Sequence, residues 1–170
     1  MEPGGDKFSD GNVFSLIDAR ITMKTLAIML LILGLLVLVW IRLRPIDRDR
    51  WHVDPADQDA EEDAGIRLIG REAPRFPADA DMVLAALQDI ALSESGTRLL
   101  DGDPDEGMMT FISRSGLLGR PSFMTVKAVN EGASTKLVVA WRSGGSVSPD
   151  VGRERIDRWM QDMRLRLGEA

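Results

Sequence analysis

The sequence predicts an α+β protein with an N-terminal transmembrane helix, followed by a two-layer domain of order αββββα. In that domain an antiparallel four-stranded sheet has two helices on one face. Three observations predict this fold: residues 25–41 form an apolar run without a charge, two later segments carry apolar residues at helical spacing, and four short segments between them follow a period of two. Beyond the apolar run, residues 65–170 suffice for one α+β domain that completes its own core.

The apolar run has the length of a membrane-spanning helix. At about 1.5 Å per residue it extends roughly 26 Å, close to the ~30 Å hydrocarbon core of a bilayer. Lys24, Arg42 and Arg44 flank the run and can extend to the membrane interface. A buried helix of a soluble protein is the alternative, but the run has no polar face. We therefore expect a single-pass anchor over residues 23–44 that contacts the lipid bilayer through residues 25–41.

The beginning of the chain is typical of a signal anchor. Met23-Lys24 leads directly into the apolar run, and IRLRP follows it where a cleaved signal carries small residues. Residues 1–22 are then a disordered tail, or an artefact of a misplaced start codon if Met23 is the initiator. The arginines after the run favour a domain in the cytoplasm, whereas the export-like start favours the periplasm. We expect the periplasm and keep the cytoplasm as the alternative.

Residues 45–64 are predicted to be an acidic linker. The segment has eight acidic residues against Arg48 and Arg50, which gives it a net charge of −6, and a self-repelling segment of this kind is solvated. His52, the single histidine, lies in this linker beside Trp51, where we expect an interfacial polar residue rather than a catalytic base.

The remaining composition excludes several classes of function. From residue 64 to the end there are fifteen acids and fourteen bases without a basic block, so we expect no nucleic-acid partner. The chain has no cysteine, which excludes disulfides, thiolate metal sites and cysteine nucleophiles. The acids of DGDPDEG imitate the start of an EF-hand loop, but Glu106 stands where the sharp turn needs glycine. We therefore expect no metal site and no cofactor.

Two helices and four strands follow the linker. The first helix is predicted over residues 79–93, because Asp79 or Asp81 can cap it and the stripe from Val83 to Ile90 is apolar. The last helix is predicted over residues 149–167, with Ser148 as the cap and Trp159 at the centre of its apolar stripe. The strands are predicted over residues 97–100, 108–114, 123–129 and 135–142. Short, turn-rich connections between these strands indicate an antiparallel meander.

Two loops are candidate binding sites. The turn after the second strand places Leu117 and Leu118 between glycines, where an apolar tip contacts a partner or folds back over the sheet. Arg142 and Ser143 begin a glycine-rich loop that leads into the last helix near Asp150. Such a loop can hold an anion, although a plain strand-to-helix connection explains the same residues.

The segments TFISRS, GLLGR, WRSGGS and SPDVGRERIDRW resemble the domain of unknown function 1499 family, and RWHVDP after an anchor is similar to its membrane-tethered bacterial members. The matching residues at the C-terminal end are Arg142, Ser143, Asp150, Gly152, Arg155 and Ile156. Two departures are Pro121-Ser122, where the family usually has paired aspartates, and a missing asparagine after Asp-x-Gly. The family has no assigned activity, so the resemblance implies an architecture only.

Two functions follow as hypotheses. The first is a non-catalytic binding or assembly module at the membrane surface, with a membrane-protein partner and with binding residues among Leu117, Leu118, Arg142, Ser143, Asp150 and Arg155. The alternative is a hydrolase-type enzyme in which Asp150 supplies the carboxylate and Arg142 clamps an anion. The enzyme requires these two side chains to converge on a concave site, whereas the binding module requires only an exposed surface.

Overall fold

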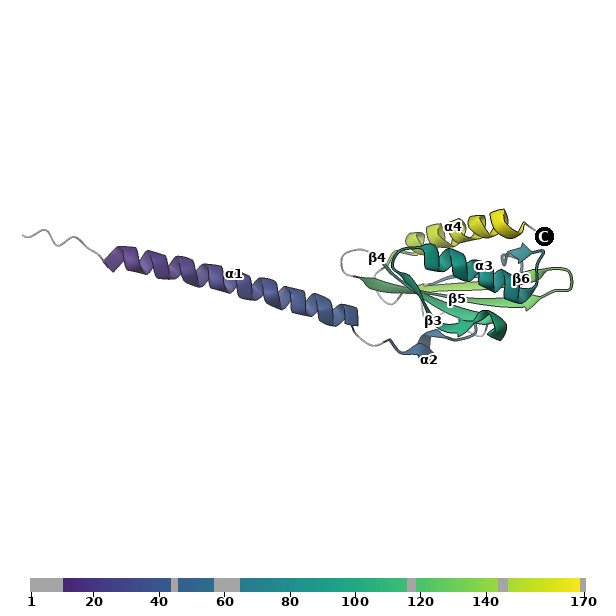
Figure 1. Cartoon of the computed structure of the whole chain (residues 1–170), viewed down its shortest axis with the longest axis horizontal. Helices are drawn as coiled ribbons and strands as arrows, with labels where there is room; N and C mark the ends of the chain where they lie inside the picture. The colour runs from purple at the N-terminus through teal and green to yellow at the C-terminus, as the bar shows by residue number, and fades with distance from the viewer. Residues whose placement is uncertain (1–10, 44–45, 57–64, 116–118, 144–146, 169–170) are drawn as a thin grey trace, which may run out of the picture. The chain divides into compact units, whose positions relative to one another are not determined.

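The computed structural model describes residues 11–43, 46–56, 65–115, 119–143 and 147–168. The chain divides into two compact units, Met1–Arg44 and Pro45–Ala170 (Figure 1). Leu117 and Leu118, the predicted apolar tip, lie outside the described residues.

The described part of the first unit is one helix, α1 (Gly11–Leu43). Its segment Thr22–Ile41 is long and apolar enough to cross a membrane, and none of it is buried inside the structure. This segment agrees with the predicted N-terminal apolar helix. The helix also includes residues 11–22, which the sequence predicts to be part of a disordered tail. That assignment is wrong for these residues because extending an existing helix costs far less than nucleating a new one.

The second unit is built on a six-stranded antiparallel sheet in the order β1-β6-β5-β4-β3, with β2 also paired to β6. Its strands are β1 (Ile66–Leu68), β2 (Arg75–Phe76), β3 (Thr97–Asp103), β4 (Met108–Ser115), β5 (Arg120–Asn130) and β6 (Thr135–Ser143). The α+β class is confirmed, but the predicted strand number and the order αββββα are wrong. The short strands β1 and β2 come from the stretch around Pro74, which is too brief to show a period of two.

Among the described residues of this unit, four helical segments accompany the sheet: α2 (Arg48–Trp51), α3 (Ala80–Ser93), the 3-10 turn η1 (Pro104–Glu106) and α4 (Pro149–Leu167). Helix α4 has the predicted bounds, and the Ser148 hydroxyl accepts a hydrogen bond from the N–H of Asp150, as an N-cap should. In Figure 1, α3 and α4 lie along the same side of the sheet. The prediction of two helices on one face is therefore confirmed for the long helices.

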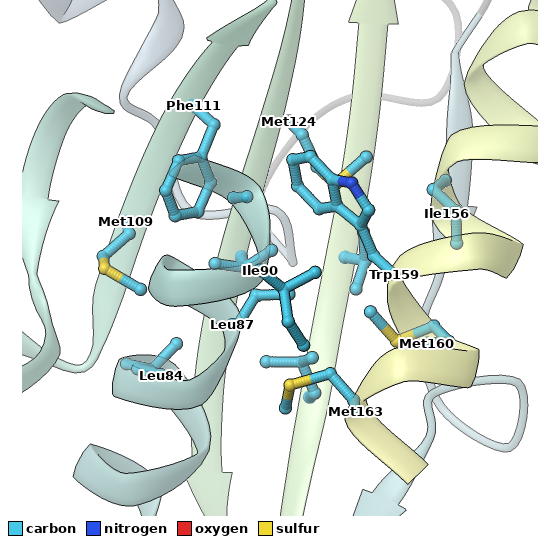
Figure 2. Packing of buried hydrophobic residues seen from close by; sticks show 14 of the residues in the cluster. Leu84, Leu87, Ile90, Met109, Phe111, Met124, Ile156, Trp159, Met160 and Met163 are labelled. Atoms are coloured by element: carbon cyan, nitrogen blue, oxygen red, sulfur yellow. The ribbon is translucent and has the colours of Figure 1, made fainter. Parts of the chain in front are cut away.

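The main core fills the space between these helices and the sheet. Leu87 from α3 and Trp159 from α4 point toward Phe111 and Met124 on the strands (Figure 2). Trp159 is 1% exposed and meets Phe111 edge to face, with ring centroids 5.8 Å apart. The predicted burial of Trp159 in the centre of the α4 stripe is confirmed.

The opposite face of the sheet has a second, smaller core. Its buried members are Trp51, Leu100, Ile112 and Phe123, with Ile46 packed against them. Residues 46–54, which we call the strap, therefore belong to the folded domain. The prediction of a solvated linker is wrong for this part of the segment, because the apolar area of Trp51 outweighs the local charge. Residues 57–64 lie outside the described residues.

Candidate functional site

The strap is seated on the sheet by its tryptophan. The Trp51 ring stacks on the Phe123 ring, with centroids 3.7 Å apart and planes inclined by 10°. The guanidinium carbon of Arg142 lies 5.0 Å from the centroid of the Trp51 ring and that of Arg50 lies 5.4 Å from it. Trp51 thus combines a stacked aromatic contact with cation–π attraction. These contacts stabilise its position beyond the effect of its buried apolar area alone.

The main-chain carbonyl of Trp51 is the second attachment. It accepts a hydrogen bond of 2.7 Å from a terminal nitrogen of Arg142 and one of 3.2 Å from the Thr125 hydroxyl. Strand alternation explains why these side chains reach the strap: Trp141 and Met124 face the helices, so Arg142 and Thr125 face the other way. Arg142, the predicted anion clamp, therefore holds the segment that follows the apolar helix.

His52 joins the strap to the sheet through a chain of hydroxyl groups. Its Nδ1 lies 2.9 Å from the Thr110 hydroxyl, which lies 3.1 Å from the Thr125 hydroxyl. Thr125 donates to the Trp51 carbonyl, because a carbonyl oxygen only accepts. Thr110 must then donate to Thr125, and His52 must donate from Nδ1, for all three contacts to be satisfied. The chain of hydrogen bonds therefore places a proton on Nδ1 of His52.

The sheet is shaped to receive His52. Gly102 has φ of +84°, a conformation that favours glycine, and a Cβ added there would lie 2.9 Å from Cε1 of His52. A side chain at this position would also overlap the backbone of β4. The glycine therefore brings the histidine ring close to the edge strand.

Asp54 completes the strap with an ion pair to Lys127. Partial burial raises the pKa of the Asp54 carboxyl, but hydrogen bonds from Lys127 and from the N–H of Ala56 outweigh it and hold the pKa below its ordinary value of 3.8. The charged form of Asp54 is thus the one that pairs with Lys127.

A second polar cluster lies where α3 ends beside α4. Arg155 donates from Nε to both oxygens of Glu94, at 3.0 and 3.2 Å, and from a terminal nitrogen to the Ser122 hydroxyl at 3.2 Å. Trp159 donates its indole N–H to Glu94 at 2.8 Å, and the exposed Arg158 donates to the same carboxylate. Arg155, a predicted binding residue, is 7% exposed and holds the two helices and β5 together.

The remaining residues of the family-like pattern also have roles in the fold. Gly152 lets α4 approach the sheet closely, because a Cβ there would overlap the indole ring of Trp141. The Ser143 hydroxyl accepts a hydrogen bond of 3.2 Å from the N–H of Val147, which shapes the entry to α4. Asp150 is exposed and bonds to Ser148 in the first turn of that helix.

Arg142 and Asp150, the pair required by the hydrolase hypothesis, have separate partners. Arg142 is directed to the strap on one face of the sheet, and Asp150 begins the helix that packs on the other. A cavity of about 420 Å³ lies between residues 68–75 and the α4 residues Asp157, Met160 and Arg164. Neither member of the pair lines it.

The sequence did not predict that Trp51, Thr110 and Thr125 are joined by hydrogen bonds. The available signal was a tryptophan and a histidine side by side in a segment otherwise rich in charge. Because Trp51 and Thr125 are separated by 74 residues, only the folded structure shows that they meet.

No protein-family model matches the chain. No curated protein matches it closely enough to count as a relative, and the resemblance to the domain of unknown function 1499 family remains a prediction.

Proposed function

We propose that this protein is a single-pass membrane protein whose α+β domain is a non-catalytic binding or assembly module at the membrane surface. The observation that carries the proposal is the hydrogen bond from Arg142 to the carbonyl of Trp51. Through this bond Arg142, the best candidate for an anion clamp, fixes the segment that follows the anchor. The apolar helix segment Thr22–Ile41, in which Lys24 is the one charged residue, supports the membrane part of the proposal.

A short connection between anchor and domain fits this role. Helix α1 ends at Leu43 and the strap begins at Ile46, so two residues separate them instead of a linker of about twenty. Along the sequence the domain follows the apolar helix almost directly, which suits a protein that meets partners in or on the same membrane.

We further propose that the protein is a bacterial member of the resembled family, retained by its signal anchor with the domain in the periplasm. The proposal is supported by the MK start before the apolar run and by the match from Arg142 to Ile156. Arg42, Arg44, Arg48 and Arg50 after the run favour the cytoplasm and make it the competing location.

Flotation with liposomes tests the anchor. The full chain should float with vesicles and resist extraction at high pH, because the apolar helix spans the hydrocarbon core. A chain that begins at Pro45 should stay in the soluble fraction and unfold cooperatively. Recovery of the full chain as a soluble monomer without detergent would contradict the proposal.

The leucine tip tests the binding part. If Leu117 and Leu118 contact a membrane-protein partner, changing both to Ser leaves the unfolding free energy nearly unchanged and removes chemical cross-links to that partner in membranes. If they pack on their own domain, the unfolding free energy falls by about 2 to 4 kcal/mol. A fall beyond about 2 kcal/mol would assign the leucines to the fold and remove the best candidate surface.

A further inference from the structure

The cavity of about 420 Å³ beside α4 has walls from two parts of the fold. One wall is a single face of α4, because Asp157, Met160 and Arg164 are three and four positions apart. The other wall is the stretch from the end of β1 to the start of β2, residues 68–75. Pockets that hold small molecules in proteins commonly have volumes of about 300 to 1,000 Å³. This cavity therefore has room for a small ligand.

The wall formed by residues 68–75 is fixed to the sheet. Both of its ends pair with β6, and the carbonyl of Pro74 accepts a hydrogen bond of 2.9 Å from the N–H of Leu137. On the facing wall, Met160 is 3% exposed and belongs to the main core. Because both walls are held by the fold itself, the cavity is preformed.

The direction of α4 along β6 decides which side chains share an end of the cavity. Gly152, in the first turn of α4, lies against the indole ring of Trp141 near the end of β6. Gly168, just after α4, lies beside Pro77, with 3.8 Å between an added Cβ and the proline ring. Pro77 directly follows β2, so the C-terminal half of α4 lies at the β2 end of the cavity.

The two ends of the cavity differ in charge. Arg164 in the C-terminal half of α4 lies at the same end as Arg75, which begins β2. Asp157 is seven positions before Arg164 on the same face, which places it about 10 Å away along the helix axis. Arg71 and Glu72 also line the cavity, and their opposite charges offset each other. The cavity thus has two guanidinium groups at one end and a carboxylate at the other.

Arg75 is positioned to bind an oxyanion. Its Nε donates to Glu131 at 3.0 Å, and its Nη1 donates to the carbonyl of Ala73 at 3.4 Å. These two bonds fix the plane of the guanidinium group. Within the part of the chain that the structure describes, Nη2 of Arg75 forms no hydrogen bond. Since guanidinium groups bind carboxylate oxygens in a defined geometry, Nη2 is available for an oxygen of a ligand.

We propose that this cavity binds a small zwitterion, in which a short carbon chain joins a carboxylate to an ammonium group. The carboxylate matches the β2 end, because its two oxygens provide one acceptor for each of Arg75 and Arg164. The carbon chain contacts Met160, and the ammonium group donates to Asp157 at the other end. The proposal adds a small-molecule site to the binding module and does not depend on the membrane anchor.

Isothermal titration calorimetry of the full chain in non-ionic detergent micelles tests the ligand class. The probes are γ-aminobutyrate, δ-aminovalerate and ε-aminocaproate, which differ only in chain length. At least one of them should bind with Kd of about 1 mM or below. Valerate and pentylamine each lack one of the two charges and should bind at least about tenfold more weakly than the best zwitterion. Absence of binding by all three zwitterions at concentrations up to about 20 mM would overturn the proposal.

Two variants of α4 test the position of the site. Arg164→Gln should weaken binding of the best zwitterion at least about tenfold. Arg153→Gln makes the same change at an exposed arginine of α4 that does not line the cavity, and it should leave Kd within about twofold. Arg164 is exposed as well, and thermal unfolding of both variants confirms that the fold is kept. Equal weakening by the two variants would show that binding follows net charge and would overturn the site.

Asp157→Asn tests the ammonium end separately. It should weaken the zwitterion to about the affinity of valerate and leave the affinity for valerate within about twofold, because valerate has no ammonium group. Equal losses for both probes would contradict the proposed orientation of the ligand. Flotation with liposomes is independent of these titrations, so failure of the small-molecule site and failure of the membrane anchor are distinguishable.

Discussion

Trp51 lies flat on Phe123, with ring centroids 3.7 Å apart, and so joins the segment after the apolar helix to the centre of the sheet. The two residues are 72 positions apart in the sequence. The contact makes the strap part of the domain and turns one face of the sheet, which the strand pattern predicts to meet solvent, into a second core. The folded domain therefore includes residues 46–54 and does not begin near residue 65.

Glu94 and Arg158, which belong to the same ion-pair cluster, should differ sharply in their contribution to stability. Glu94→Ala leaves the guanidinium of Arg155 buried without its counter-charge, so the unfolding free energy should fall by about 3 to 5 kcal/mol. Arg158→Ala removes a partner whose side chain is 55% exposed and should cost less than about 1 kcal/mol. Denaturant unfolding measures both. Similar losses in the two variants would contradict the assignment of Arg155 as the structural partner.

Gly152→Ala should destabilise the domain although the position is helical. Alanine in place of glycine within a helix ordinarily stabilises by about 0.5 to 1 kcal/mol. At this position the added Cβ overlaps the Trp141 ring, and forcing it into the core should cost about 1 to 3 kcal/mol. The exposed neighbour Val151, changed to alanine, is the control and should have little effect. A stabilised Gly152→Ala domain would show that α4 does not rest on Trp141.

The ion pair of the strap predicts a dependence of stability on pH. Because the Asp54 carboxyl has a lower pKa in the folded state than in the unfolded chain, its contribution is present above about pH 4 and is lost as the pH falls through the folded pKa. Asp54→Asn should flatten this acid limb of the stability curve. Hydrogen bonds from Lys136 and Arg75 also lower the pKa of Glu131, so this carboxyl contributes to the same acid limb. The effect of Asp54→Asn should therefore be measured in a Glu131→Gln background. An unchanged acid limb would mean that Asp54 is not paired in solution.

The elements with strong local signals could be predicted from the sequence, and the elements defined by distant contacts could not. Ser148 and Pro149 mark the first turn of α4 by capping chemistry, so its bounds follow from local residues alone. Strands β1 and β2 have only three and two residues and exist because β6 offers an edge to them. The outward face of Arg142 follows from strand alternation, but its partner Trp51 is 91 residues away. No local pattern encodes that contact.

The side of the membrane can be determined with one introduced thiol. Ser95 is exposed in the domain, and the chain has no other cysteine, so Ser95→Cys reports on its compartment alone. In intact cells with a permeable outer membrane, an impermeant thiol reagent should label the protein if the domain is periplasmic. Labelling only after lysis would place the domain in the cytoplasm, as the arginines after the apolar run favour.

The unfolding free energy of residues 45–170, compared with that of residues 65–170, tests the central claim most directly. If the strap is part of the fold, the shorter chain loses the burial of Trp51, and its unfolding free energy should be lower by about 3 to 5 kcal/mol. Its denaturant dependence should also be smaller, because less surface becomes exposed on unfolding. Trp51→Ala in the longer chain should reproduce most of the loss. Equal unfolding free energies and equal denaturant dependence for the two chains would contradict the account and return residues 45–64 to the role of a solvated linker.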